Sequence, residues 1–193
     1  WLEELLQTEW QDLKVYLTSV TEQWSVASIS GPNSSAILEA CMSEDQNITD
    51  DFPFMTMKNT FIAGIPSRIF RISFTGEMAF EINVPARYGL ALWSHLMQVG
   101  KEYNLTAYGT EAMHVLRAEK GFIIVGQETD GTVTPYDLGM DWIVSKKKSD
   151  FIGKRALERE SMNEPQRKQL VGLLTTDPRK VIPEGAHAVL NPN

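Results

Sequence analysis

The fold of this chain is decided by the stretch Arg71-Ile-Ser-Phe-Thr-Gly-Glu-Met-Ala-Phe-Glu-Ile-Asn-Val84. Apolar and polar residues alternate up to Phe74, which is the period-2 pattern of a half-buried strand. Thr75 and Gly76 interrupt the alternation, and it then resumes on the apolar residues Phe80, Ile82 and Val84. The pattern predicts a strand, a tight turn and a second strand that contains Glu81. Glu77 is thus expected just after the turn, where a fixed backbone can hold a carboxylate toward a cleft.

The composition restricts the class of protein. The 193 residues suffice for one large domain, or for one domain and part of another, and 42% of them are hydrophobic. The formal net charge of −7 argues against a nucleic-acid partner, since such a partner needs a clustered basic face. The run Lys146–Lys148 is interpreted as a solvated turn rather than a phosphate site. The sequence has no apolar run of about 18 residues and no signal peptide, so we expect no membrane contact and a cytoplasmic location.

Two further features concern the cysteine and the ends of the chain. Cys41 is the single cysteine, which excludes an internal disulfide and favours a buried, unreactive thiol. The chain opens on Trp1 inside a helical pattern and closes on Asn193 shortly after a predicted strand. We therefore expect a piece of a longer polypeptide.

The remaining patterns predict an α+β fold. Helices are predicted at residues 1–12, 30–41, 85–100, 110–121 and 154–157, and strands at 15–20, 24–29, 54–62, 65–74 and 80–84. This order is typical of a ferredoxin-like split βαβ module with an antiparallel sheet. We assign residues 1–160 to that domain. Residues 168–174 and 186–190 resemble first strands, so we interpret 167–193 as the start of a truncated barrel domain.

The sequence lacks the common catalytic arrangements. Its three histidines, His95, His114 and His187, are isolated, which favours structural roles. No Gly-x-Gly-x-x-Gly and no Gly-Lys-Ser/Thr sequence occurs, so neither a Rossmann dinucleotide site nor a P-loop is predicted. We also predict no metal site. The remaining candidates are carboxylates on turns and helix starts. Glu111 lies in a predicted first helical turn, where interaction with the helix dipole suffices to explain it.

Several motifs resemble one known superfamily. Residues 74–82, Phe-Thr-Gly-Glu-Met-Ala-Phe-Glu-Ile, resemble the Tyr-Thr-Gly-Glu-x-Gly-Phe-Glu-Ile motif of the folate-binding aminomethyltransferase (glycine-cleavage T-protein) superfamily. Other pieces follow in the order of that superfamily: Gly31-Pro32 at a helix start, Leu116–Gly121 resembling Leu-Arg-Leu-Glu-Ala-Gly, Thr134-Pro135 after an acidic loop, and Phe151–Lys154 resembling Phe-Ile-Gly-Arg. Together they cover nearly the whole chain.

Within the superfamily, residues 109–131 resemble the α-subunit family of heterotetrameric sarcosine oxidases. The T-proteins usually have Ala-Arg-Asp where this chain has Thr110-Glu111-Ala112, so a glycine-cleavage-type aminomethyltransferase is the second alternative. A non-catalytic folate-binding or docking module is the third. Folate-linked iron–sulfur assembly proteins carry Lys-Gly-Cys-Tyr-x-Gly-Gln-Glu, whereas Phe122 replaces that cysteine here.

The resemblance implies a reaction and its partners. Tetrahydrofolate would capture the one-carbon unit from sarcosine oxidation as 5,10-methylenetetrahydrofolate. The FAD, FMN and NAD of the complex, and the other sarcosine oxidase subunits, would lie outside this chain. The catalytic aspartate of the family lies in a segment that precedes anything in this sequence, so the resemblance implies no catalytic residue here.

The resemblance also implies a folate site. Glu77 matches the glutamate that binds the pteridine, and a carboxylate can accept hydrogen bonds from two adjacent ring donors. We expect Glu77 to be buried and to face a cavity. Arg117 and Glu119 match positions near the site, although Glu119 also fits a simple ion pair at the helix end. Phe74 fits either stacking on the ring or plain core packing.

Overall fold

The computed structural model describes residues 1–42, 51–183 and 185–187. Contacts divide the chain into two compact units, residues 1–122 and residues 123–193, and each unit is described by itself. Unit 1 contains, in order, α1 (Leu2–Thr8), β1 (Trp24–Ser30), α2 (Ser34–Ala40), β2 (Met57–Ile62), β3 (Ile65–Phe70), β4 (Ala79–Pro85), α3 (Gly89–Val99) and α4 (Thr110–Glu119). Short 3-10 helices occupy Thr21–Gln23, Ala86–Tyr88 and Gly100–Tyr103.

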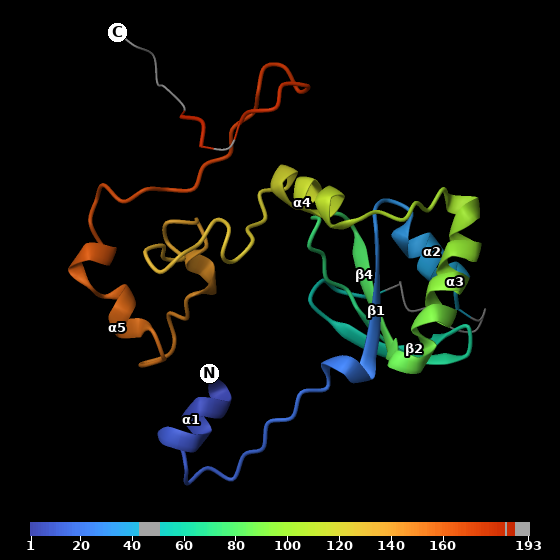
Figure 1. Cartoon of the computed structure of the whole chain (residues 1–193), viewed down its shortest axis with the longest axis horizontal. Coiled ribbons are helices and arrows are strands. Elements are labelled where there is room, and N and C mark those ends of the chain that lie inside the picture. Colours follow the sequence, from blue (N-terminus) through green and yellow to red (C-terminus); the bar gives the residue numbers. More distant parts are fainter. Residues whose placement is uncertain (43–50, 184, 188–193) are drawn as a thin grey trace. The chain divides into compact units, whose positions relative to one another are not determined.

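The four strands of unit 1 form one antiparallel sheet in the order β1-β4-β3-β2 (Figure 1). Ile82 of β4 lies opposite Ala27 of β1 and Ile69 of β3, so apolar side chains share one face. The α+β prediction is confirmed. The strands predicted at 24–29, 54–62 and 80–84 correspond to β1, β2 and β4, and the predicted hairpin at Ala63-Gly64 joins β2 to β3.

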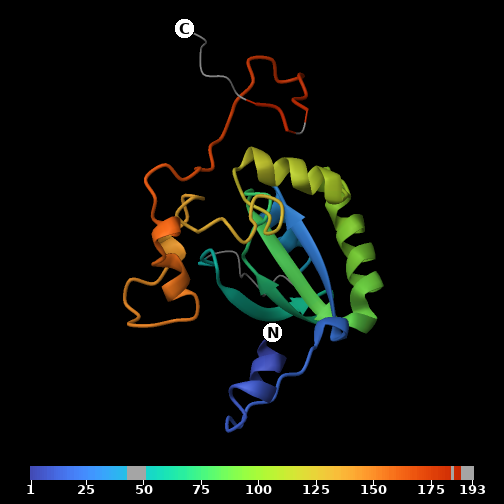
Figure 2. The same cartoon turned by 60° about the vertical axis from the view of Figure 1, so that its left-hand side comes forward.

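Helices α2 and α3 cover the apolar face of the sheet (Figures 1 and 2). Leu38 from α2 and Leu92 from α3 are buried in one cluster with Ile69, Phe80 and Ile82 of the strands. Burying such side chains stabilises the fold by about 1.5–3 kcal/mol each. On the opposite face of the sheet, Val26 is 55% exposed.

Two predictions about strands in unit 1 are wrong. The predicted strand at 15–20 has no strand pairing in the part of the chain that is described, and Tyr16 within it is fully accessible. Strand β3 ends at Phe70 instead of Phe74, and residues 71–78 form an irregular connection in place of a tight turn. The backbone of Arg71 stays beside the β2 segment, since its N–H donates to the Thr56 carbonyl at 3.0 Å and its carbonyl accepts from the Met55 N–H at 2.9 Å. Regular pairing ends here because Met55 has a φ of +66°, which is not a strand conformation.

Unit 2 has little regular structure. It contains α5 (Lys154–Leu157) and 3-10 helices at Asp141–Ile143 and Glu160–Met162, and no strand is assigned in its described residues. Residues 168–174 make no strand pairing, and the predicted strand at 186–190 lies mostly outside the described residues. The barrel domain therefore stays a prediction. Within the described parts of both units, no helix combines the length and the apolar character needed to cross a bilayer.

Candidate functional site

The connection between β3 and β4 carries the motif around Glu77. The Ser73 hydroxyl accepts a hydrogen bond from the Gly76 N–H at 2.9 Å, and Gly76 has a φ of +80°. That φ lies in the left-handed region, where a residue with a Cβ is strained by roughly 1–2 kcal/mol. Thr75 is buried, and its hydroxyl makes no hydrogen bond within the described residues. A buried hydroxyl without a partner costs free energy, so this turn is held at a cost to the fold.

The C-terminal end of α4 carries the motif Leu116–Gly121. Helix α4 closes with hydrogen bonds from Phe122 N–H to the Arg117 carbonyl at 2.8 Å and from Gly121 N–H to the Ala118 carbonyl at 2.9 Å. Gly121 has a φ of +79°, as this type of helix end requires. The Arg117 guanidinium is buried and donates to the Phe122 carbonyl at 3.0 Å. The side chain thus braces the residues that follow the helix.

The two motifs meet in space, although about 40 residues separate them along the chain. A Cβ placed on Gly76 would lie within 2.7 Å of the Cβ, Cγ and Cδ atoms of Lys120. Such distances are well inside van der Waals contact, so the Lys120 stem lies directly on the Gly76 backbone. Figure 1 shows α4 beside the connection that leads into β4. We call this arrangement, residues 73–77 with residues 117–122, the turn–helix site.

The structure brings the four predicted folate residues to the turn–helix site with different degrees of burial. Arg117 is buried, Phe74 is 38% exposed, and Glu77 and Glu119 are exposed. The expectation that Glu77 is buried is wrong. None of the four side chains lines the described cavities of about 700, 480 and 310 Å³. Within the turn Thr75 is the buried residue, and the Glu77 side chain, two positions further on, lies at the surface.

Glu81 differs from Glu77 in its surroundings. It is half-buried on the face of the sheet that α2 and α3 leave uncovered, between Ser28 of β1 and Phe70 of β3. Burial raises the pKa of the Glu81 carboxyl above its ordinary value. Its position follows from the alternation of β4, since Phe80 and Ile82 point to the core.

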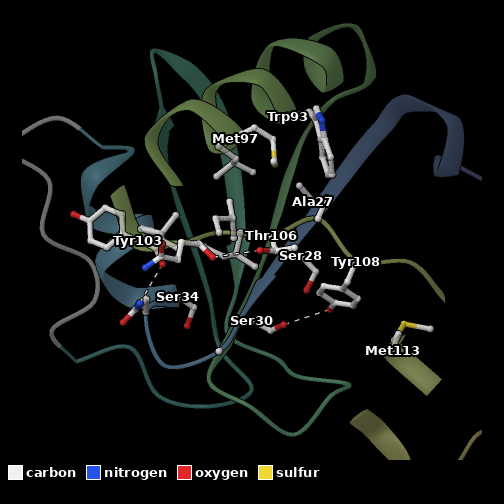
Figure 3. Close-up of a pocket in the computed structure, with 18 of the residues that line it drawn as sticks. Ala27, Ser28, Ser30, Ser34, Trp93, Met97, Tyr103, Thr106, Tyr108 and Met113 are labelled. Carbon is white, nitrogen blue, oxygen red and sulfur yellow. Dashed lines mark hydrogen bonds between the residues drawn. The ribbon is translucent and has the colours of Figure 1, made fainter. Parts of the chain in front are cut away.

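The largest of the three cavities was not predicted from the sequence. It runs along β1 and is closed by α3 and by residues 103–110 (Figure 3). Trp93 and Met97 form its apolar wall, and the Ser30 and Tyr108 hydroxyls are 3.3 Å apart across it. Two stretches noted in the sequence contribute to the lining, Gly31-Pro32 and the start of residues 109–131, but neither predicts a cavity at this place.

The buried polar groups described in unit 2 are organised around the ion pair of Asp137 and Arg167. The Asp137 carboxylate accepts hydrogen bonds from the Thr134 N–H at 2.7 Å and from the Arg167 guanidinium at 2.9 Å. The Arg167 guanidinium holds the pKa of Asp137 well below its usual range. A separate cavity of about 480 Å³ is lined by Lys146, Lys148 and Lys154. No cluster of potential metal ligands occurs among the described residues of either unit.

Comparison with known proteins identifies the class. The chain matches the GCVT N-terminal domain family over residues 1–148, and it belongs to that family. It is 53% identical over 190 residues to "Sarcosine oxidase subunit alpha" of Corynebacterium sp. (strain U-96) and 41% identical over 189 residues to the protein of that name in Rhizobium meliloti (strain 1021). These alignments cover 98% and 96% of this chain, and 20% and 19% of the relatives.

A third relative carries a different name. The chain is 36% identical over 150 residues to "Aminomethyltransferase" of Chlorobium limicola, an alignment that covers 77% of this chain and 41% of the relative. The resemblance to sarcosine oxidase α subunits and to the aminomethyltransferases is therefore confirmed. The chain spans about a fifth of the length of the sarcosine oxidase relatives it matches.

Proposed function

We propose that this chain binds tetrahydrofolate at the turn–helix site as part of a sarcosine oxidase α subunit, an oxidoreductase. The observation that carries the proposal is the convergence of the two folate-type motifs, residues 74–82 and 116–121, through the contact of Gly76 with Lys120. Membership of the GCVT family and the 53% identity to a sarcosine oxidase α subunit support it. Folate-related one-carbon transfer is the activity that these relationships share.

The proposed reaction balances with sarcosine, tetrahydrofolate and oxygen as its three substrates. Sarcosine loses two electrons at its methyl-amine bond, and tetrahydrofolate takes the resulting one-carbon unit as 5,10-methylenetetrahydrofolate. Glycine is released, and oxygen takes the two electrons and two protons as hydrogen peroxide. We assign the FAD, FMN and NAD steps to parts of the complex outside this chain, because its sequence has no dinucleotide fingerprint. The other subunits are the proposed partners, and the cytoplasm is the proposed location.

Glu77 is the proposed pterin ligand. Its carboxylate has no hydrogen bond or ion pair in the described part of the chain, so both oxygens are available to the adjacent ring N–H and amino donors. Because Glu77 is exposed, the proposal requires that the ring and its surroundings exclude water from the pair on binding. Phe74, 38% exposed beside the turn, is the proposed stacking partner. Arg117 and Glu119 are proposed to shape the other side of the site, and no residue of this chain is proposed as catalytic.

We further propose that residues 1–160 form the folate-binding domain and that residues 167–193 begin a barrel domain. A glycine-cleavage-type aminomethyltransferase remains the second candidate, favoured by the 36% identity to an aminomethyltransferase. A non-catalytic folate-binding or docking module is the third. Peroxide release on addition of sarcosine to the full-length gene product, purified together with the subunits that assemble with it, separates the first candidate from the other two.

The test of the folate site is a calorimetric titration of the full-length gene product with tetrahydrofolate. Changing Glu77→Ala is expected to weaken binding by about 2–4 kcal/mol, since the ring donors lose their acceptor in a site that water has left. The matched control is Glu111→Ala, which removes an exposed carboxylate from the first turn of α4. Unchanged affinity of the Glu77 variant would remove this residue from the site.

A further inference from the structure

We infer that Lys120 is a specificity-determining residue of the turn–helix site and that its ammonium donates a hydrogen bond to the ring carbonyl of the pterin held by Glu77. The inference rests on the proposed function and deepens it. Neither the motif of the superfamily, which has alanine at this position, nor the composition of the chain marks Lys120 as a ligand.

The first argument is the position of the Lys120 stem. Its Cβ, Cγ and Cδ atoms lie on the backbone of Gly76, where no residue with a Cβ would leave room for them. Glu77 is the next residue in the chain. A lysine stem usually keeps much of its rotamer freedom, and its packing on a fixed turn removes part of that freedom before any ligand binds. The stem of Lys120 is therefore fixed against the residue that directly precedes Glu77.

The second argument is the rigidity of the helix end that carries Lys120. The residue caps α4, and the two hydrogen bonds that close the helix follow directly at Gly121 and Phe122. The buried Arg117 guanidinium adds a third bond, to the Phe122 carbonyl at 3.0 Å. These bonds fix the backbone from which the Lys120 side chain starts, and a fixed backbone is one requirement of a specific ligand contact.

The third argument is charge. Within the described residues, neither Lys120 nor Glu77 forms a salt bridge, although the two opposite charges emerge from adjoining segments. Surface ion pairs of this kind gain little in water, so the two groups lose little by turning to a ligand instead. The pair offers two acceptor positions on the carboxylate beside a cationic donor.

The ligand chemistry matches this pattern. A pterin ring presents on one edge an amino group, a ring N–H and a carbonyl oxygen, in that order, which is donor, donor, acceptor. A carboxylate and a neighbouring ammonium present acceptor, acceptor, donor. With both partners in place, every polar atom on the edge of the ring is satisfied, and a ring that lacks the carbonyl would leave the ammonium without a partner.

The experiment is a titration of the full-length gene product with 6-methyltetrahydropterin, which has the ring but lacks the aminobenzoyl-glutamate tail. Changing Lys120→Met keeps most of the stem on Gly76 and removes only the ammonium. We expect about a tenfold loss of affinity for this ring, the size of one hydrogen bond to a charged group. The control is Lys101→Met, an exposed lysine in the 3-10 helix Gly100–Tyr103, which is expected to change nothing.

The outcomes separate this inference from the proposed function. The inference is supported if Lys120→Met lowers the affinity for 6-methyltetrahydropterin tenfold and the affinity for tetrahydrofolate by the same factor. A loss for tetrahydrofolate with unchanged affinity for 6-methyltetrahydropterin overturns it, because Lys120 would then hold the carboxylates of the tail. The inference is also overturned if Lys120→Met binds both ligands as tightly as the unchanged protein does. In that case the proposed folate site still stands if Glu77→Ala loses binding. If the unchanged protein binds neither ligand, the proposed function fails as well.

Discussion

Different interactions stabilise the interior of unit 1 and the interior of unit 2. The buried apolar side chains of the described chain lie between Ile29 and Leu96, inside unit 1, where they form one cluster between the sheet and its two helices. In unit 2 the two buried residues among those described are polar: Asp137, which forms the ion pair with Arg167, and Thr134, which donates hydrogen bonds to the Asp137 carboxylate. The comparison teaches that the turn–helix site is built on the unit with an apolar core. Its geometry should therefore resist changes of pH and salt, whereas unit 2 should respond to both.

The largest effect is expected from a change in the core of unit 1. Ile82 is fully buried and lies in the centre of the sheet. Changing Ile82→Ala should lower the free energy of unfolding of unit 1 by about 4 kcal/mol, through lost burial and the cavity left behind. Urea unfolding followed by alkylation of Cys41 measures it, because burial raises the pKa of this thiol to about 11 and keeps it unreactive in the folded unit. The exposed Val26→Ala on the opposite face of the sheet is the control, with little expected effect.

The next effect concerns the ion pair of unit 2. Changing Asp137→Ala leaves the Arg167 guanidinium without its carboxylate partner and removes the acceptor of the Thr134 N–H. We expect unit 2 to lose about 3 kcal/mol of stability, as when one member of a buried pair is removed. Proteolysis with fragment mapping measures it, since cleavage should begin within residues 123–193. If the Asp137→Ala variant and the unchanged protein resist proteolysis equally, the ion pair does not stabilise unit 2.

A smaller effect is expected at the turn itself. Changing Gly76→Ala forces a Cβ into a left-handed backbone and against the Lys120 stem. We expect the free energy of unfolding to fall by about 1–2 kcal/mol. We also expect the affinity for tetrahydrofolate to fall. Gly64→Ala is the matched control, because Gly64 has a φ of +76° but open space around it. If the two variants bind tetrahydrofolate equally well, the contact between the turn and the helix end plays no part in the site.

The smallest effect is the response of unit 2 to acid. The folded pKa of Asp137 is depressed, so the stabilisation from its ionised form is present above the unfolded pKa of about 3.9 and is lost as the pH falls toward the folded value. The thermal unfolding temperature of unit 2 should therefore be constant from about pH 6 to about pH 4 and should fall below about pH 4. The Asp137→Asn variant should not show this decline. A decline that persists in the variant would assign the acid response to other carboxylates.

Local patterns predicted the regular part of the fold. The alternation in β1, β2 and β4 and the apolar stripes of α2 and α3 fix which face of each element is buried, so these elements follow from the order of residues alone. The segment 15–20 shows the limit of such patterns. It has the composition of a strand, but a strand needs a partner, and none is present for it among the described residues.

The candidate site was predicted in its residues and not in its geometry. The motif picked out Glu77 and Phe74 together with Arg117 and Glu119, yet it gave the wrong burial for Glu77. That burial depends on the path of residues 71–78 beyond the last paired residue of β3, where the Arg71 guanidinium binds the Phe52 carbonyl and the Met78 sulfur. Neither contact is visible in a local pattern.

The sequence by itself determined the class of fold, the family motifs and the faces of the strands, because each depends on residues within a few positions of one another. Only the tertiary structure decided that Lys120 lies on Gly76, that Arg167 binds Asp137 across 30 positions and that a cavity runs along β1. Such contacts join segments far apart in the chain. Their formation depends on the packing of the whole unit, which overrides the preference of any one segment.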